Sequence, residues 1–292
     1  MKCAIVKVMI DFHVHTTASD GQYTPSEIIK LAKEKNLTAI AITDHDTVSG
    51  LKEGETAARN AGINFIRGTE LNIHWPTGEF HLLGLGLKEI SPSLKEIIEN
   101  LQKNRGERNY LMFEKLVSLF PNLSWEELQA MFPNTSLGRP HFARYLVAKG
   151  IVKQNQTAFD KFLGKGRECY IPRSGANLDE AIVAISESGG YPVIAHPMSL
   201  FVSWGKLPDV IQDLYYRGVV GLEAYHPGAR NSECFRLDEL GRKLGFFITG
   251  ASDFHGEKIR KDRKLGHTCG GRKIDTKLIP EAEKLVEQFK VK

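Results

Sequence analysis

Short apolar runs alternate with helical patterns along most of the chain. Residues 37–43 form a nearly continuous apolar run, which is typical of a parallel strand buried on both faces. Before it, Thr24-Pro25-Ser26-Glu27 predicts a helix start, with Thr24 as N-cap, Pro25 at the first helical position and Glu27 completing a capping box. Similar patterns predict strands at 63–66, 191–195, 219–224 and 246–249, and helices at 47–60, 178–188, 207–216 and 234–244. This repeat favours a barrel-like α/β fold.

Two segments interrupt the repeat of strands and helices. Residues 71–87 predict a hairpin that turns at a Pro-Thr-Gly sequence and carries His81 on its return strand. Residues 91–166 keep apolar residues at helical spacing and contain no buried-strand pattern. We therefore predict one α/β domain formed by residues 1–90 and 167–292, with a helical insertion between the two parts.

Composition fits a folded protein in a reducing compartment. The 292-residue chain is 41% hydrophobic, which is enough for a sizeable core. Its four cysteines are far apart and form no Cys-x-x-Cys pair, so neither a disulfide framework nor a thiolate zinc site is indicated: Cys3, Cys169, Cys234 and Cys269. The apolar residues among the first ten are interrupted by Lys2 and Lys7 and are too short for the hydrophobic region of a signal peptide, and no later segment approaches a membrane span. We expect a soluble cytoplasmic protein.

The net charge of +4 is small, but it is unevenly distributed. Residues 88–173 contain 14 Lys and Arg against 9 Asp and Glu, whereas the remainder contains 25 against 26. We interpret most of the basic side chains in the middle segment as solvated helix faces. A few of them are candidates for contact with an anionic substrate.

Two histidines one residue apart, His13 and His15, follow the first apolar run. Because side chains alternate along a strand, both imidazoles are expected on one face, where they could share a metal ion. Asp20 lies in a Ser-Asp-Gly turn five residues later and could bend back to hold a second ion or support the first. The His-Val-His pair alone is equally compatible with a surface strand that carries two ordinary histidines.

Polar residues that can bind metals recur at the ends of the later predicted strands and on the hairpin, where α/β barrels place their chemistry. The candidate ligands are His13, His15, Asp20, His45, Glu70, His81, His196, Asp253 and His255. Six of the ten histidines belong to this set. Unrelated histidines would not be expected to recur at one strand end after another. Nine ligands are too many for one ion, so three ions with a bridging carboxylate fit better.

The motifs together resemble those of the polymerase and histidinol phosphatase (PHP) domain family. The resemblance covers essentially the whole chain and rests on His-Val-His, Ser-Asp-Gly, Thr-Asp-His-Asp, Gly-Thr-Glu, the hairpin histidine, Ala-His-Pro and Gly-Ala-Ser-Asp-Phe-His-Gly. It implies a distorted seven-stranded (β/α) barrel, with the helical insertion at 91–166 covering the active site. It also implies two or three divalent ions, and the mixed imidazole and carboxylate ligands suit Mn, Fe or Zn.

The resemblance assigns the candidate ligands to three ions by position. His13, His15, Glu70 and Asp253 resemble the ligands of one ion, Asp20, His45 and His255 those of a second, and Glu70, His81 and His196 those of a third. Glu70 would bridge two of the ions. No ligand position is missing, which argues against a non-catalytic copy.

The insertion and its Gly-Arg-Pro-His-Phe-Ala-Arg motif resemble one branch of the family. That branch contains stand-alone 3',5'-bisphosphonucleotide phosphatases and 5'-to-3' exoribonucleases that act on short RNA. Arg139 and His141 match its motif and are candidate phosphate-binding residues, although capping and packing of the insertion helix is an alternative for both. The chain departs from the branch after Tyr170, because Tyr-Ile-Pro-Arg-Ser-Gly replaces Tyr-Val-Pro-x-Gln-Trp. A tryptophan that could stack a base is therefore absent, and Arg173 becomes a third candidate phosphate contact.

The predicted activity is hydrolysis of a phosphate ester by a metal-activated bridging hydroxide. The expected substrate is a small phosphorylated molecule, a nucleotide or short RNA, and no membrane or obligate protein partner is expected. We predict catalytic roles for Asp253, His255 and His226. A protonated histidine, His255 or His226, is a candidate for stabilising the sugar oxygen that leaves.

Three alternatives share part of this pattern. Histidinol phosphate phosphatase, or another small-molecule phosphatase, would use the same ligands, but the insertion and its Gly138-Arg139-Pro140-His141 motif weigh against it. Amidohydrolases also carry His-x-His on a first barrel strand, but those with two metals commonly bridge them with a modified lysine. Neither 63–66 nor 191–195 contains a lysine. A non-catalytic accessory domain is disfavoured by the complete ligand set and the lack of a polymerase region.

Overall fold

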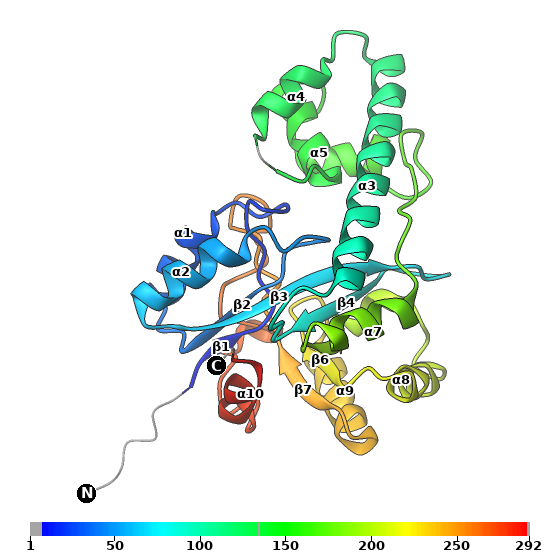
Figure 1. Ribbon diagram of the computed structural model, residues 1–292. Coiled ribbons are helices and arrows are strands. Elements are labelled where there is room, and N and C mark those ends of the chain that lie inside the picture. Colours follow the sequence, from blue (N-terminus) through cyan, green and yellow to red (C-terminus); the bar gives the residue numbers. More distant parts are fainter. Residues whose placement is uncertain (1–7, 134, 291–292) are drawn as a thin grey trace, which may run out of the picture. The chain divides into compact units, whose positions relative to one another are not determined.

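The computed structural model describes residues 8–133 and 135–290. The described residues form a seven-stranded sheet in which the strands lie in their order along the chain (Figure 1). The strands are β1 (Ile10–Asp11), β2 (Ala39–Ile42), β3 (Asn64–Ile73), β4 (Phe80–Leu85), β5 (Tyr191–Ile194), β6 (Gly221–Tyr225) and β7 (Phe247–Gly250). The number of strands matches the seven-stranded barrel that the family resemblance implies.

The sheet curls into a nearly closed barrel. Strands β1, β2 and β3 are parallel to one another, as are β5, β6 and β7, whereas β4 runs antiparallel to β3 and β5. The chain after β1 meets the chain after β7 through a parallel bridge between Val14 and Phe254. The fold is therefore the distorted seven-stranded (β/α) barrel that the sequence predicted, with the hairpin as its antiparallel part.

Six helices of the described chain belong with the sheet and pack around it (Figure 1). They are α1 (Pro25–Glu34), α2 (Leu51–Ala61), α7 (Leu178–Glu187), α8 (Leu207–Tyr216), α9 (Asn231–Leu244) and α10 (Ala282–Phe289). The start of α1 matches its prediction, because the Thr24 hydroxyl accepts the Glu27 amide at 3.2 Å and the Glu27 carboxylate accepts the Thr24 amide at 2.8 Å. Helix α2 ends at Gly62, whose φ of 70° suits the left-handed C-cap conformation.

Helix α10 was not predicted, although its buried residues keep helical spacing. Phe289 is almost fully buried, and its ring centroid lies 5.5 Å from that of Phe12, 5.2 Å from that of Tyr191 and 5.3 Å from that of Phe247. These aromatic partners belong to or follow β1, β5 and β7. The last helix therefore joins strands from both halves of the barrel, and burial of such a side chain contributes about 1.5–3 kcal/mol.

Of the described residues, those between 99 and 174 form a second compact unit, and those up to 98 and from 175 onward form the barrel unit. Its helices are α3 (Pro92–Leu119), whose first residues belong to the barrel unit, α4 (Trp125–Met131), α5 (Arg139–Ala148) and α6 (Asn155–Ala158), followed by a π-helical turn (Phe159–Leu163). A separate hydrophobic core, which includes Met112, Phe142 and Leu146, holds this unit together.

Both limits of the insertion lie later in the chain than the predicted residues 91 and 166. At its start, Ser91 and Ser93 are tied to the end of α7, because the Ser91 amide donates to Ser188 Oγ at 3.1 Å and Ser93 Oγ donates to Glu187 at 2.5 Å. At its end, Cys169 lies in the core of the insertion unit. Pairings of this kind join residues that are distant in sequence, so local patterns do not locate them.

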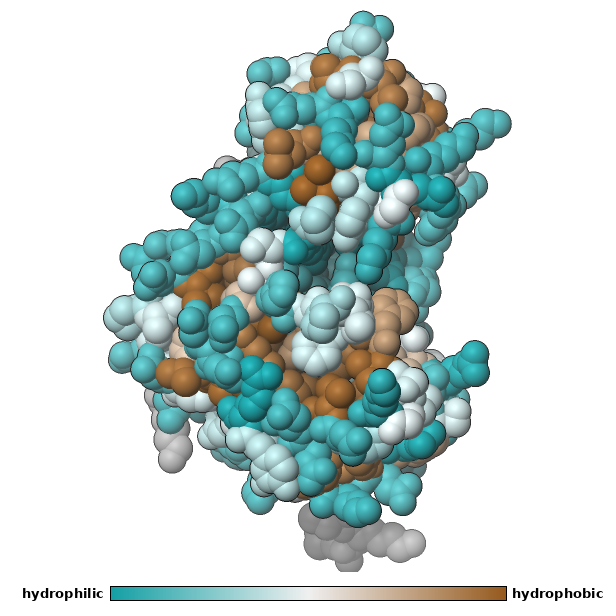
Figure 2. All heavy atoms as spheres, turned by 90° about the vertical axis from the view of Figure 1, so that its right-hand side faces the viewer, coloured by the Kyte–Doolittle hydropathy of each residue, from teal (hydrophilic) through white to brown (hydrophobic). Residues whose placement is uncertain are grey.

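Neither the described cysteines nor the hydrophobic residues on the surface add a constraint on the fold. Among the described residues, Cys169, Cys234 and Cys269 are buried and free of disulfides, while Cys3 lies outside the described residues. The face drawn in Figure 2 shows hydrophilic residues with hydrophobic ones between them. Within the described part of the chain, no helix is both long enough and apolar enough to cross a membrane.

Candidate metal centre

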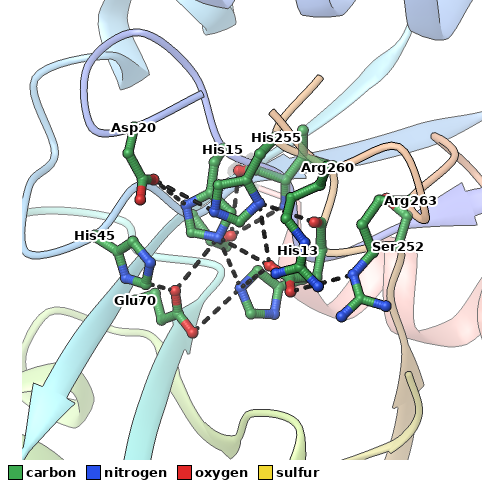
Figure 3. A network of polar contacts seen from close by, with 12 residues as sticks. His13, His15, Asp20, His45, Glu70, Ser252, His255, Arg260 and Arg263 are labelled. Carbon is green, nitrogen blue, oxygen red and sulfur yellow. Dashed lines mark hydrogen bonds and ion pairs between the residues drawn. The ribbon is translucent and has the colours of Figure 1, made fainter. Parts of the chain in front are cut away.

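Two strand ends that are far apart in sequence meet at one edge of the barrel. His13 and His15 follow β1, and Asp253 and His255 follow β7. The Asp253 amide donates to the His13 carbonyl at 3.1 Å, and the His15 amide donates to the Phe254 carbonyl at 3.0 Å. The Nε2 atoms of His13 and His15 lie 3.1 Å apart (Figure 3). Both imidazoles therefore point to the same side, as strand alternation requires.

Glu70, in β3, lies at the centre of the cluster and is fully buried. Imidazole nitrogens from five histidines surround its two carboxylate oxygens. Oε1 lies 2.9 Å from His81 Nδ1, 3.0 Å from His196 Nε2 and 3.3 Å from His13 Nε2, and Oε2 lies 2.8 Å from His45 Nδ1 and 3.3 Å from His15 Nε2. Burial alone would raise the pKa of Glu70, but the neighbouring imidazoles hold it well below its ordinary value.

Asp20 forms a second focus with His255, His45 and His15. One of its oxygens, Oδ1, lies 3.4 Å from His255 Nε2 and 4.0 Å from His15 Nδ1. The rings of His15 and His255 are stacked with centroids 4.0 Å apart. Burial would raise the pKa of Asp20, yet the charges of His255 and His45 keep it well below its ordinary value. Asp20 is therefore ionised despite its burial, as a carboxylate that binds a metal must be.

Four buried ligand atoms make no hydrogen bond within the described residues: His15 Nδ1, Asp20 Oδ1, His45 Nδ1 and Glu70 Oε2. A buried polar atom without a hydrogen-bond partner is energetically costly, so these four atoms indicate a binding partner other than the described residues. His45 Nδ1 and Glu70 Oε2 lie only 2.8 Å apart, but not in hydrogen-bond geometry. Atoms that converge in this way suit a shared cation, and the donor types suit Mn, Fe or Zn. The residues present therefore fit a metal centre.

Distances divide the nine candidate ligands into four overlapping groups, within each of which the ligand atoms lie within 4.8 Å of one another. The groups are His15, Asp20, His45 and His255; His13, Glu70 and His196; His13, His15 and Asp253; and His45, Glu70 and His81. Glu70 belongs to two groups, which suits a bridging role. Unlike the predicted sets, these groups separate His81 from His196 and add His15 to the group around Asp20. The assignment of each residue to an ion stays a prediction.

The buried Glu223 in β6 was not among the predicted site residues. Its Oε2 accepts a hydrogen bond from His13 Nδ1 at 2.8 Å, and its Oε1 accepts the His196 amide at 3.0 Å. The Nε2 lone pair of His13 is thereby directed into the cluster. A carboxylate behind a ligating histidine fixes its tautomer and raises its basicity. The available signal was a charged residue within an otherwise apolar strand, which is costly to bury unless it is paired.

Replacing Glu223 by glutamine is expected to lower metal affinity or activity about 10- to 100-fold, because the His13 tautomer is no longer fixed. Titration with Mn²⁺ and measurement of kcat/KM check this. Glu239→Gln, an exposed substitution in α9, serves as the control and should leave both quantities unchanged. Wild-type metal affinity and activity in Glu223→Gln would show that Glu223 does not support the centre.

Two features shape the loop that carries Asp20. Asp44 accepts hydrogen bonds from the Thr16 amide and hydroxyl, both at 2.7 Å, and from the Ser19 hydroxyl at 2.5 Å. A Cβ atom at Gly21 would lie 2.5 Å from the His15 carbonyl oxygen, so the Ser-Asp-Gly turn requires glycine there. The Thr-Asp-His-Asp motif therefore supplies a loop anchor next to the candidate ligand His45.

The hydrogen bonds of His226 favour a supporting role over proton donation. Its Nδ1 accepts the Gly228 amide at 3.0 Å, so the ring proton is on Nε2, which donates to Asp253 Oδ2 at 3.2 Å. Burial lowers the pKa of His226 despite the neighbouring carboxylates. The neutral ring thus fixes one oxygen of Asp253, whose other oxygen, Oδ1, lies 3.4 Å from His15 Nε2.

The histidines differ in how readily they lose a proton. Burial would lower the pKa of His255, but the charges of Asp20 and Asp253 raise it to about 9. Burial lowers the pKa of His45 to about 4. Because only a neutral imidazole binds a metal, a cation at His255 must compete with a proton, whereas His45 is already neutral near pH 7.

The other predicted site residues belong to the insertion unit. Arg139 is the first residue of α5, and its guanidinium carbon lies 5.6 Å from the centroid of the Tyr170 ring. His141 is buried, and its Nδ1 accepts the Gly138 amide at 2.9 Å, which caps α5. Arg173 is partly buried in the segment after the last helical turn of this unit. For His141 the contacts match the capping alternative, and phosphate binding by the three residues stays a prediction.

A model of the PHP domain matches residues 11–164, which is more than half of the chain. The chain belongs to the PHP domain family. The matched region contains the first six candidate ligands of this PHP protein, and the remaining three, His196, Asp253 and His255, follow it in the sequence.

Relatives of this PHP protein include named phosphoesterases. The 3',5'-nucleoside bisphosphate phosphatase of Chromobacterium violaceum is 31% identical over 260 residues, which cover 89% of this chain and 91% of the relative. A 5'-3' exoribonuclease of Haemophilus influenzae is 30% identical over 246 residues, covering 84% and 89%. A solved structure from Bifidobacterium adolescentis, described as a proposed metal-dependent phosphoesterase, has a TM-score of 0.81 and 28% identity over 93% of this chain and 94% of that one.

Proposed function

We propose that this PHP protein is a metal-dependent phosphoesterase that hydrolyses phosphate esters of nucleotides. The observation that carries the proposal is the convergence of nine imidazoles and carboxylates, eight of them buried, and four of the nine have a ligand atom without a hydrogen bond in the described structure. The names of the relatives, a nucleoside bisphosphate phosphatase and an exoribonuclease, support the substrate class. Release of a 3'-phosphate and removal of 5' nucleotides from short RNA are both within the proposal.

Two or three divalent ions, held by the nine candidate ligands, would lower the pKa of a water molecule toward neutrality and offset negative charge on the phosphoryl oxygens. The chain itself fixes the geometry. Glu70 presents both oxygens to imidazoles, Glu223 orients His13, and His226 orients Asp253. Because these groups are buried and held by hydrogen bonds, little reorganisation is needed when substrate binds.

Substrate selection is the less constrained part of the proposal. Arg139, His141 and Arg173 are proposed phosphate contacts, on the basis of the family branch that their motif resembles. The absent tryptophan after Tyr170 favours recognition through phosphate over recognition through a stacked base. Covering of the active site by the insertion also stays a prediction from the sequence.

The test is a comparison of four substrates with purified, Mn-loaded protein: adenosine 3',5'-bisphosphate, AMP, histidinol phosphate and a 5'-phosphorylated RNA oligomer. We expect release of phosphate from the bisphosphate, of mononucleotides from the RNA, or both. Asp253→Ala, which removes a candidate ligand, should be inactive on all four. If the wild type cleaves none of them, the proposal is wrong, and if it prefers histidinol phosphate, a small-molecule phosphatase takes its place.

A further inference from the structure

Arg263 is a buried cation at the edge of the candidate metal centre. It lies in the loop after β7 and is 7% exposed, close to the 8% of both Asp253 and His255. Figure 3 shows Arg263 and Arg260 beside the cluster of histidines. A buried guanidinium is costly unless its charge and its N–H groups find partners. The groups around Arg263 should therefore include partners for its charge and its N–H groups.

The contacts of Arg263 within the described residues are long. Its Nε lies 3.7 Å from Asp253 Oδ2, and its Nη1 lies 3.4 Å from Asp262 Oδ2. Both distances exceed those of ordinary N–H···O hydrogen bonds, and Nε has no hydrogen-bond partner among the described residues. A guanidinium has five N–H donors in a planar fork, so this side chain retains capacity for a further acceptor.

The two carboxylates near Arg263, those of Asp262 and Asp253, also interact with other side chains. Asp262 is 58% exposed at its side chain and is held by Arg260, whose Nε and Nη2 donate to its two oxygens at 3.1 Å each. Asp253 Oδ2 already accepts a hydrogen bond from His226. If Asp253 also binds a metal ion, the negative charge of its carboxylate is shared between that ion, His226 and Arg263. Arg263 thus keeps positive charge that faces the centre.

We propose that Arg263 binds the phosphoryl group of the substrate at the metal centre, an inference that rests on the proposed function. Phosphate oxygens match the planar fork of a guanidinium and accept two parallel N–H groups. The 3.7 Å separation from Asp253 brings the guanidinium within reach of a group held beside that candidate ligand. Since Arg263 is fixed by burial, it would stabilise phosphoryl charge without having to move. The barrel unit would then contain its own phosphate contact.

Binding of inorganic phosphate to Mn-loaded protein, measured by calorimetry, tests this inference without requiring turnover. Arg263→Met should weaken phosphate binding about 10- to 100-fold, as expected for loss of charge-assisted hydrogen bonds. Arg263→Lys should weaken it less, because charge remains but the fork is lost. Arg217→Met is the matched control and should bind phosphate like the wild type, because Arg217, which follows α8, pairs with Asp179 in α7 at 2.7 Å. Manganese content should be unchanged in all three variants.

Several outcomes would overturn the inference. Wild-type phosphate affinity in Arg263→Met would do so, as would a wild type that binds no phosphate. A loss of phosphate affinity in proportion to lost manganese would mean that Arg263 only positions Asp253. If Arg263→Met does not fold, Arg263→Lys decides, and wild-type affinity in that variant refutes the contact.

The same measurements separate this inference from the proposed function. A wild type that binds phosphate through Arg263 but cleaves none of the four esters refutes the function and leaves the inference standing. A wild type that cleaves an ester, with unchanged kcat, KM and phosphate affinity in Arg263→Met, refutes the inference and leaves the function standing.

Discussion

Glu70→Gln is expected to lower the rate of ester hydrolysis about 1000-fold or more and to reduce the metal content of the protein. Loss of a group that only supports a ligand costs about 10- to 100-fold, and Glu70 contacts five imidazoles directly, so its loss should cost more. Glutamine keeps the shape of the side chain but removes its charge and one acceptor oxygen. Initial rates and elemental analysis of the purified variant measure the two effects.

The control for this prediction is Glu55→Gln. Glu55 is a partly exposed glutamate in α2 that pairs with Arg67 at 3.3 Å, an interaction worth at most about 1 kcal/mol. It should keep wild-type activity and metal content. Full metal content with activity within about 10-fold of the wild type in Glu70→Gln would contradict the central place given to Glu70.

Removal of metal ions by a chelator is expected to abolish activity and to lower the melting temperature by about 5 °C or more. A ligand at about 100 times its Kd stabilises the folded state by about 2.7 kcal/mol, and 1 kcal/mol shifts the melting temperature of a protein of this size by about 2–4 °C. Added Mn²⁺ should restore both properties. Calorimetric melting and phosphate release, measured on the same sample, check this.

Glu70→Gln provides the comparison for the stability effect. Its melting temperature should respond less to Mn²⁺ than that of the wild type, because the shared ligand is lost. An equal response in both proteins would mean that manganese stabilises the fold from a site elsewhere. Full activity after exhaustive chelation would rule out a metal-dependent reaction.

Much of the barrel could be predicted because each strand and helix has a local pattern. Helices α7 (Leu178–Glu187) and α8 (Leu207–Tyr216) match the predicted helices at 178–188 and 207–216 almost residue for residue. Helix α10 was missed even though Leu285, Val286 and Phe289 have helical spacing, since no strand follows to continue the repeat. The compact unit of residues 99–174 differs in its limits from the predicted insertion at 91–166, because hydrogen bonds and core packing between distant residues set these limits.

The candidate ligands could be located from short motifs at strand ends, because parallel strands bring those ends to one edge. Their partners could not. Glu223 meets His13 across 210 residues of sequence, and Arg263 comes to lie beside Asp253 through the path of an irregular loop. The role of His226 depends on the Gly228 amide, whose hydrogen bond to Nδ1 leaves the ring proton on Nε2, where it is donated in a hydrogen bond to Asp253. Only the folded structure shows this contact. Sequence motifs thus located the candidate ligands, and the fold shows which residues orient them.

The central claim is that the nine candidate ligands, Glu70 among them, bind divalent ions. Anomalous diffraction from crystals of the Mn-loaded protein, collected at the manganese absorption edge, tests it most directly. The account predicts two or three strong peaks among these side chains, each about 2.0–2.3 Å from imidazole nitrogens or carboxylate oxygens, with Glu70 beside more than one peak. Manganese peaks only elsewhere, or none at all in protein that hydrolyses its substrate, would contradict it.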